Sequence, residues 1–223
     1  MNVEDVLGEQ RRYYAARAPE YDDWWFRRGR YELDEDTLVR WNADVEEVES
    51  ALAAFDPVGA VVELAAGTGL WTRRLAVTAS RLVAVDASGE TLAVNRARLG
   101  DVPVEYVVAD LFDWDPADTF DLCFFGFWIS HVPEERFDAF WSFVRRLVVP
   151  GGRIFFLDGA RDPAQLEREA SPLERRQLAD GREFRIVKRY WDPDELATLV
   201  APYGFDLELR VTANGQFLYG GGS

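Results

Sequence analysis

The sequence predicts an α/β fold, in which an open and mostly parallel β-sheet carries helices on both faces. Apolar runs of strand length alternate with helical patterns along the chain, which indicates parallel strands joined by crossover helices. Three successive runs each end in an acidic residue, so that carboxylates are expected at one edge of the sheet. A length of 223 residues suits one domain with an added segment or insertion.

The N-terminal residues 1–55 are expected to form a helical segment outside the core, which we assign to residues 56–223. A helix is predicted from Asp34 to Phe55, because apolar residues recur there at three- and four-residue steps. This stripe consists of Leu38, Trp41, Val45, Val48 and Leu52.

The core pattern predicts five strands, near residues 59–64, 81–86, 104–109, 120–125 and 153–158. Helices are expected between them, near residues 69–78, 88–98 and 134–148. The last of these helices has the clearest signals, since acidic residues suit its first turn, arginines suit its last turn and Pro150 stops it. Its aromatic residues lie on one stripe and are predicted to be core.

The C-terminal part predicts one more helix and a hairpin. Asp192 is a suitable N-cap and Pro193 a suitable first residue for a helix that runs to about Pro202. Residues 205–211 and 216–220 are joined through an Asn-Gly pair, which favours an antiparallel hairpin.

The turn after the first strand predicts a nucleotide-type cofactor site. The strand ends near Glu63, and small residues with Gly67 and Gly69 follow before a helix begins. Such residues allow a ligand to approach the backbone closely, and a helix N-terminus offers free N–H groups. A dinucleotide fingerprint would need a third glycine where this chain has Thr72, which disfavours a nicotinamide cofactor.

Two further acidic residues stand at the ends of the next strands. Asp86 lies 17 positions after Gly69, where an acceptor can bind both ribose hydroxyls, and Asp110 ends the third strand. A single aspartate at a strand end is more often a helix cap. Three acidic residues at successive strand ends are hard to explain as caps alone.

These spacings resemble motif I and its neighbours in the class I S-adenosylmethionine (SAM) methyltransferases, although Ala65 stands where that family usually has glycine. The resemblance covers residues 58–220 and implies a Rossmann-like seven-stranded sheet of order 3-2-1-4-5-7-6. It implies SAM as cofactor and S-adenosylhomocysteine (SAH) as product. The expected cofactor-binding residues are Glu63, Ala65, Gly67 and Gly69 for the methionine end, Asp86 and Ala87 for the ribose, Asp110 and Leu111 for the adenine, and also Tyr21 and Phe125.

The acceptor site is expected to be aromatic. The N-terminal stretch is similar to the cap, or lid, of small-molecule methyltransferases, which closes the acceptor pocket; plain packing onto the sheet is the alternative. The residues expected around the acceptor are Tyr13, Trp24, Trp25, Phe127 and Trp128. The resemblance therefore implies methyl transfer to a small, apolar or aromatic acceptor, on O, N or C. A non-catalytic SAM- or SAH-binding module with a regulatory or assembly role is the alternative.

The single histidine, His131, follows the fourth strand and is the candidate catalytic residue. Its ordinary pKa suits a general base that takes a proton from an attacking hydroxyl or amine. Alternatively, His131 caps the next helix or binds a backbone carbonyl, and methyl transfer depends mainly on alignment.

The insertion at 159–190 is locally basic. It carries eight basic and six acidic residues, a balance of +2. Such a run is usually a solvated face with intrahelical ion pairs. Alternatively, some arginines at 161–189 bind an anionic acceptor.

Composition limits the partners. A formal charge of −15 opposes binding to nucleic acid, and the fourth strand lacks the Asn/Asp-Pro-Pro-aromatic motif of amino-methylating nucleic-acid enzymes. No apolar run is long enough for a membrane span, and no signal peptide is recognised, so we expect a cytoplasmic protein. Cys123 is expected in the core, no metal site is expected, and the protein is expected to be a monomer or homodimer.

Overall fold

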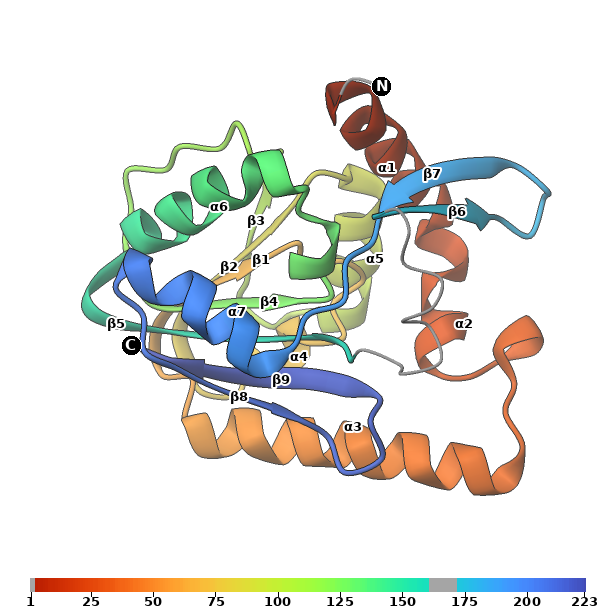
Figure 1. Cartoon of the computed structure of the whole chain (residues 1–223), viewed down its shortest axis with the longest axis horizontal. Coiled ribbons are helices and arrows are strands. Elements are labelled where there is room, and N and C mark those ends of the chain that lie inside the picture. The colour runs from red at the N-terminus through yellow and green to blue at the C-terminus, as the bar shows by residue number, and fades with distance from the viewer. Residues whose placement is uncertain (1–2, 161–171) are drawn as a thin grey trace.

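A seven-stranded sheet forms the centre of the computed structural model, which describes residues 3–160 and 172–223 (Figure 1). The strand order is β3-β2-β1-β4-β5-β9-β8, in which β9 pairs antiparallel with β5 and β8. The other neighbours pair in parallel. The strands are β1 (Gly59–Leu64), β2 (Ala79–Asp86), β3 (Glu105–Val108), β4 (Phe120–Gly126), β5 (Val148–Gly159), β8 (Leu207–Val211) and β9 (Phe217–Gly222). This confirms the expected order 3-2-1-4-5-7-6. Two strands outside this sheet, β6 and β7, precede its last two strands in the chain, so these are numbered 8 and 9 and not 6 and 7.

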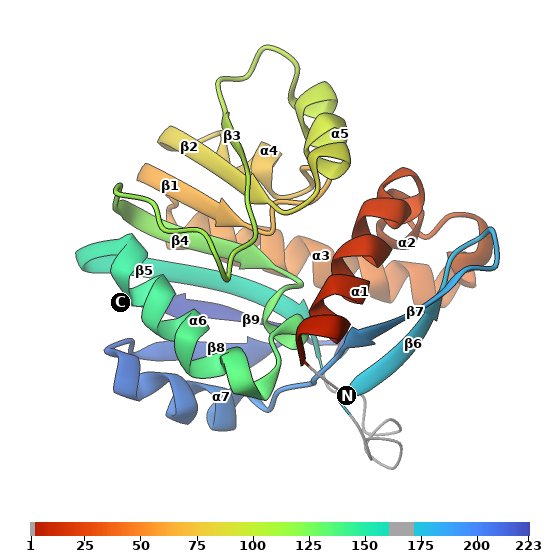
Figure 2. The ribbon, with the colours of Figure 1, turned by 90° about the horizontal axis from the view of Figure 1, so that it is seen from above.

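Helices cover both faces of the sheet, as predicted (Figure 2). On one face lie α6 (Glu134–Leu147) and α7 (Pro193–Val200), and on the other lie α3 (Glu35–Phe55), α4 (Thr72–Leu75) and α5 (Gly89–Leu99). Alternate residues of each central strand therefore enter two separate cores. Val62 packs with α6 and α7, whereas its neighbour Val61 packs with α3 and α4.

The turn after β1 includes residues that were predicted to be helical. The predicted helix at 69–78 is reduced to α4, because three positions of the turn have left-handed backbone: Ala65 at φ 51°, Gly67 at φ 57° and Gly69 at φ 89°. A side chain at Gly69 would also collide with Asn95 of α5, whose Oδ1 would lie 2.6 Å from the new Cβ. The turn is thus held close to α5.

The N-terminal segment begins with two helices, α1 (Val3–Arg17) and α2 (Tyr21–Trp25), with a 3₁₀ turn between them. They lie beyond the carboxyl ends of the parallel strands (Figure 2). Asp22 of α2 accepts a hydrogen bond from Thr68 Oγ1 at 2.7 Å and pairs with Arg98 of α5. These contacts join the segment to the turn after β1.

The described part of the insertion forms a hairpin and not a helix. Strands β6 (Leu173–Gln177) and β7 (Glu183–Val187) pair antiparallel in a separate sheet that lies along α1 (Figures 1 and 2). Leu178 and Ile186 pack against Tyr13 of α1. Intrahelical ion pairs are therefore ruled out for residues 172–190; residues 161–171 of the insertion lie outside the described residues. Among the described helices, none has the length and apolar character needed to cross a membrane.

Candidate active site

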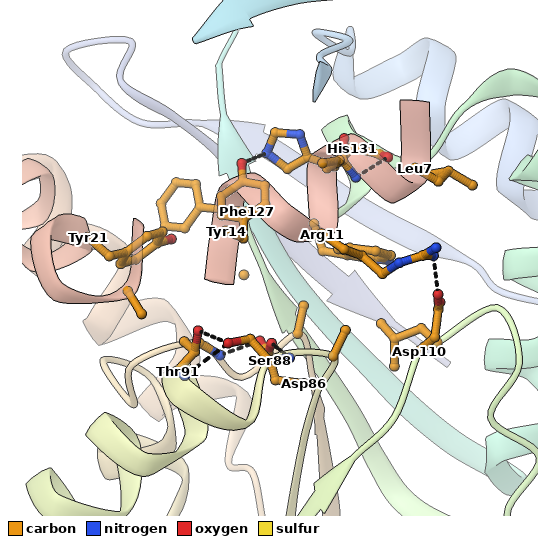
Figure 3. A pocket seen from close by; sticks show the side chains of 18 of the residues that line it. Leu7, Arg11, Tyr14, Tyr21, Asp86, Ser88, Thr91, Asp110, Phe127 and His131 are labelled. Atoms are coloured by element: carbon orange, nitrogen blue, oxygen red, sulfur yellow. Dashed lines mark hydrogen bonds and ion pairs between the residues drawn. The ribbon is translucent and has the colours of Figure 1, made fainter. Parts of the chain in front are cut away.

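A pocket, here called the strand-end pocket, lies between α1 and the carboxyl ends of β1, β2 and β4. Figure 3 shows Tyr14 and Tyr21 on one side of it and Asp86 and Ser88 on the other. It encloses about 850 Å³ of empty space when the open solvent at its mouth is included. Its walls are formed by Leu7, Gln10, Arg11, Tyr14, Ala18, Tyr21, Ala65, Gly67, Asp86, Ala87, Ser88, Thr91, Asp110, Leu111, Phe112, Gly126, Phe127, Trp128 and His131.

Asp86 fixes the turn after β1 and faces the strand-end pocket. Its Oδ2 accepts a hydrogen bond from the N–H of Gly67 at 3.0 Å, and its Oδ1 accepts one from the N–H of Ser88 at 2.9 Å. Burial raises the pKa of this carboxyl. Each oxygen of an ionised carboxylate has a second lone pair, so Asp86 retains acceptor capacity for the hydroxyls of a ligand.

A small recess joins the strand-end pocket beside Glu63. The two cavities share Tyr21, Ala65, Gly67, Gly126 and Phe127 as walls. Within the described part of the chain, the buried Oε2 of Glu63 and the buried Nε1 of Trp71 have no hydrogen-bond partner, and both residues line the recess. An acceptor and a donor together suit the ammonium and carboxylate groups of an amino acid. Burial raises the pKa of Glu63 to about 8.

Asp110 connects the strand-end pocket to α1. Its carboxylate pairs with Arg11 of α1, and its Oδ1 accepts a hydrogen bond from the N–H of Phe112 at 3.0 Å. Leu111, beside it, is buried in the same wall. The predicted adenine-binding residues therefore lie under the N-terminal helix.

His131 is held as a neutral imidazole in a 3₁₀ turn (Ile129–His131) after β4. Its Nδ1 lies 2.6 Å from the carbonyl oxygen of Val187, which can only accept, so Nδ1 carries the proton. Its Nε2 then accepts a hydrogen bond from the hydroxyl of Tyr14 at 2.7 Å. Burial, followed by the charge of Lys188, lowers the pKa of His131 to about 3.

A second cavity, here called the hairpin pocket, lies between the N-terminal segment and the hairpin β6–β7. It shares Tyr14, Tyr21, Phe127 and His131 with the strand-end pocket, and it encloses about 1160 Å³ of empty space with its opening included. Four of its remaining walls are the aromatic residues Tyr13, Trp24, Tyr31 and Tyr190.

The structure brings most of the predicted site residues to these cavities, with three exceptions. Phe125 is fully buried and stacks on Phe156 with ring centroids 4.9 Å apart, away from the pocket walls. Trp25 packs against Trp41 and Trp71 in the core. Gly69 shapes the turn but lines none of these cavities.

Of the residues of α1 that line these cavities, only Tyr13 was predicted from the sequence. Leu7, Gln10, Arg11 and Tyr14 all line the strand-end pocket. Their spacing of three and four residues is typical of one helix face, and this spacing was the available signal. In the part that the structure describes, no cluster of three or more His, Cys, Asp or Glu side chains could hold a metal ion.

Comparisons with known proteins agree with this geometry. Residues 61–152 match the family described as "Methyltransferase domain". The demethylmenaquinone methyltransferase of Clavibacter sepedonicus is 36% identical over 121 residues, which cover 53% of this chain and 49% of that protein. The cypemycin N-terminal methyltransferase of a Streptomyces species is 35% identical over 111 residues, which cover 48% and 44%. The chain thus aligns with about half the length of these curated relatives.

Solved structures match over the full length. The chain is 36% identical to that in the "DhpI-SAM-HEP complex", with a TM-score of 0.83 and coverage of 100% of both chains. The same identity holds for the "DhpI-SAH complex structure", with a TM-score of 0.80 and coverage of 100% and 98%. The cofactor is SAM and the product is SAH, and these relatives support methyl transfer over a non-catalytic module. The full-length match, the strand order and the carboxylates at three strand ends show that the chain belongs to the class I SAM-dependent methyltransferases.

Proposed function

We propose that this protein transfers the methyl group of SAM to a small acceptor in the hairpin pocket. One observation carries the proposal: the hairpin pocket and the strand-end pocket meet at Tyr14, Tyr21, Phe127 and His131. A methyl group that leaves the first cavity can reach an acceptor in the second there.

The strand-end pocket fits SAM. The unpartnered Oε2 of Glu63 and Nε1 of Trp71 suit the amino-acid end, Asp86 suits the ribose hydroxyls, and Asp110 with Leu111 suits the adenine. When bound, SAM supplies an electrophilic methyl group on a cationic sulfur, which aromatic faces favour. The chain's own contribution is to align the acceptor, exclude water and hold the acceptor's proton.

We propose that Tyr14 and His131 accept the proton that the acceptor loses. The Tyr14 proton is donated to Nε2 of His131, so the Tyr14 oxygen can still accept a hydrogen bond from an O–H or N–H of the acceptor. As the acceptor releases its proton to the Tyr14 oxygen, Tyr14 passes its own proton to His131. His131 would thus act as a base through Tyr14, but as a weak one, because its pKa of about 3 lies far below neutral pH and not near it as the sequence suggested.

A small acceptor agrees with the walls of the hairpin pocket and with some of the relatives. One relative is named for demethylmenaquinone. A Burkholderia thailandensis structure contains 1,6-didemethyltoxoflavin with SAH; at 19% identity and a TM-score of 0.68 it supports the fold alone. The proposal further places the protein in the cytoplasm, as a monomer or homodimer, without a nucleic-acid or membrane partner.

Replacement of Asp86 by Ala tests the cofactor site. We expect the affinity for SAH to fall about tenfold to hundredfold, the range for hydrogen bonds to a charged group. Calorimetry with SAH measures this, and NAD titrated in parallel is expected to give no binding heat. Asp118→Ala is the matched control, because Asp118 pairs with Arg81 on the surface. An affinity within twofold of the original would remove Asp86 from the site.

A further inference from the structure

The hairpin pocket is lined by basic side chains in a strongly acidic protein, and three of them, Arg30, Arg176 and Lys188, pair with carboxylates outside its walls. The whole chain has a formal charge of −15, yet the described walls of this pocket contain five Lys or Arg residues and no Asp or Glu. The five are Arg17, Arg30, Arg175, Arg176 and Lys188. They come from the N-terminal segment on one side and from the insertion on the other.

Arg17 is a partly buried basic wall residue for which no paired carboxylate is found among the described residues. It ends α1, and its guanidinium lies 5.6 Å from the ring centroid of Tyr13 and 5.0 Å from that of Tyr21. Its Nε is buried without a hydrogen-bond partner, and no carboxylate of the described residues pairs with it. A partly buried cation without a counter-charge loses part of its hydration, and an anionic ligand would replace this hydration with the strongest hydrogen bonds.

Arg176 and Lys188 approach the pocket from the hairpin. Residues alternate along β6, so Arg176 lies on the same face of the hairpin as Leu178 and Ile186, which pack against α1. Lys188 binds Ser130 Oγ at 2.8 Å and Asp158 at 3.1 Å, beside His131. Arg176 pairs with Glu174. Both residues are thus held by neighbours while their side chains face the cavity.

We propose that the methyl acceptor carries an oxyanion group, such as a carboxylate or phosphate, and that Arg17 and Arg176 bind this group. The inference rests on the proposed function, because it assigns the hairpin pocket to the acceptor. The planar guanidinium offers paired N–H donors that match two oxygens of such a group. Lys188 pairs with the buried Asp158 near Tyr14 and His131, where the nucleophilic atom of the acceptor would lie.

The arginines and the aromatic residues of the hairpin pocket would bind two different parts of one acceptor. The anionic group lies between Arg17 and Arg176, and the remainder contacts the aromatic residues Tyr13, Trp24 and Tyr31. A neutral acceptor would offer Arg17 weaker hydrogen bonds than an oxyanion does, which disfavours its binding. The site therefore selects for charge as well as for size.

Calorimetric titration with small probes tests the proposal. The probes are benzoate and phenyl phosphate, which are anionic, and benzamide, which is neutral and nearly the size of benzoate. Titrations are made with SAH-loaded protein and with the protein alone. The variants are Arg17→Gln and Arg176→Gln, and Arg182→Gln is the control, because Arg182 pairs with Asp180 outside the pocket walls.

We expect both anions to bind at least tenfold more tightly than benzamide, as charge-assisted hydrogen bonds allow. Arg17→Gln and Arg176→Gln should each weaken anion binding about tenfold, while SAH affinity and benzamide binding stay unchanged. Arg182→Gln should change none of these. The relative affinities of benzoate and phenyl phosphate show which oxyanion class fits better.

Equal affinities for benzoate, phenyl phosphate and benzamide would overturn the proposal, as would unchanged anion binding in both arginine variants. The SAH titration separates this result from a failure of the proposed function. If SAH binds and the anions do not, only the acceptor class is wrong. If SAH does not bind, the cofactor assignment fails, and the anion titrations of the protein alone still decide whether the cationic site exists.

Discussion

At the scale of single residues, Glu63 is expected to release a proton when the cofactor binds. Its pKa of about 8 means that roughly nine in ten molecules hold the proton at pH 7. An ammonium group beside the unpartnered Oε2 would favour the ionised carboxylate. Binding of SAH at pH 7 should therefore release up to about 0.9 proton.

Calorimetry in phosphate and in Tris measures this release, because the two buffers have different ionisation enthalpies. The wild-type protein should give different binding enthalpies in the two buffers, and Glu63→Gln should reduce the difference. Equal wild-type enthalpies would contradict the prediction.

The raised pKa of Glu63 also affects the stability of the protein without ligand. The contribution of Glu63 to the free energy of unfolding is full below pH 4.5 and is lost as the pH rises towards 8.

His131 and Tyr14 give a paired prediction. If His131 receives the acceptor's proton through Tyr14, then His131→Asn and Tyr14→Phe should each lower turnover by about a hundredfold or more. Tyr14→Phe is informative because it leaves the hydrogen bond from His131 Nδ1 to Val187 in place. Steady-state rates at saturating SAM measure the effect. A loss below tenfold in Tyr14→Phe, with the fold intact, would leave alignment as the mechanism.

The lowered pKa of His131 also fixes how stability depends on pH. The unfolded chain binds a proton near pH 6.5, whereas the folded chain does so only near pH 3. The free energy of unfolding should therefore fall as the pH drops below 6.5, by up to about 1.4 kcal/mol per pH unit from this residue. Urea titrations between pH 7 and 4 measure this slope, and His131→Asn should show a smaller one.

At the scale of elements, the first two helices are expected to be needed for turnover but not for the sheet. Deletion of residues 1–30 removes α1 and α2 and leaves Asp34, the N-cap of α3, in place. It also removes Tyr14 and Arg17 and opens both pockets to water. Circular dichroism should show a folded protein and rate assays no methyl transfer. Methylation at the full rate by the truncated chain would contradict this.

Elements with local signals were predictable, and elements held by distant partners were not. The first residues of α3 and α7 could be predicted from Asp34 and Asp192, whose side chains accept hydrogen bonds from backbone N–H groups of the first turn. By contrast, α1 buries the polar Gln10, which binds the backbone of His131 and of Val187 more than 100 residues away. The polar Gln10 interrupts the apolar pattern of the buried face, which otherwise consists of Val6, Leu7 and Tyr13, and so weakens the signal that the sequence could show.

The same distinction applies to the site. Asp86 and Gly67 belong to a motif of fixed spacing, so their positions could be inferred. The sequence could not show that Phe125 and Phe127 lie in different places, because their placement depends on strand alternation and on one backbone angle. Phe125 points into the core beside α6, whereas Phe127 has φ 56° and reaches the pocket walls.

At the scale of the whole molecule, charge is distributed unevenly. The chain has a formal charge of −15, while the hairpin pocket collects cations from segments more than 150 residues apart in the sequence, such as Arg17 and Arg176. Net charge correctly describes the average surface, but it cannot locate a cavity whose walls meet only after folding. For this reason the sequence left open whether the arginines of the insertion bind an anion.

Helix α1 contacts both cavities at once, through Arg11 at Asp110 and through Tyr14 at His131. A ligand in either cavity that favours this position of α1 stabilises the wall of the other cavity as well. The two binding equilibria are then thermodynamically linked, and each ligand raises the affinity of the other by the same factor. After the reaction, departure of either SAH or the methylated product would therefore weaken binding of the one that remains, so that the second ligand to leave dissociates more readily than the first.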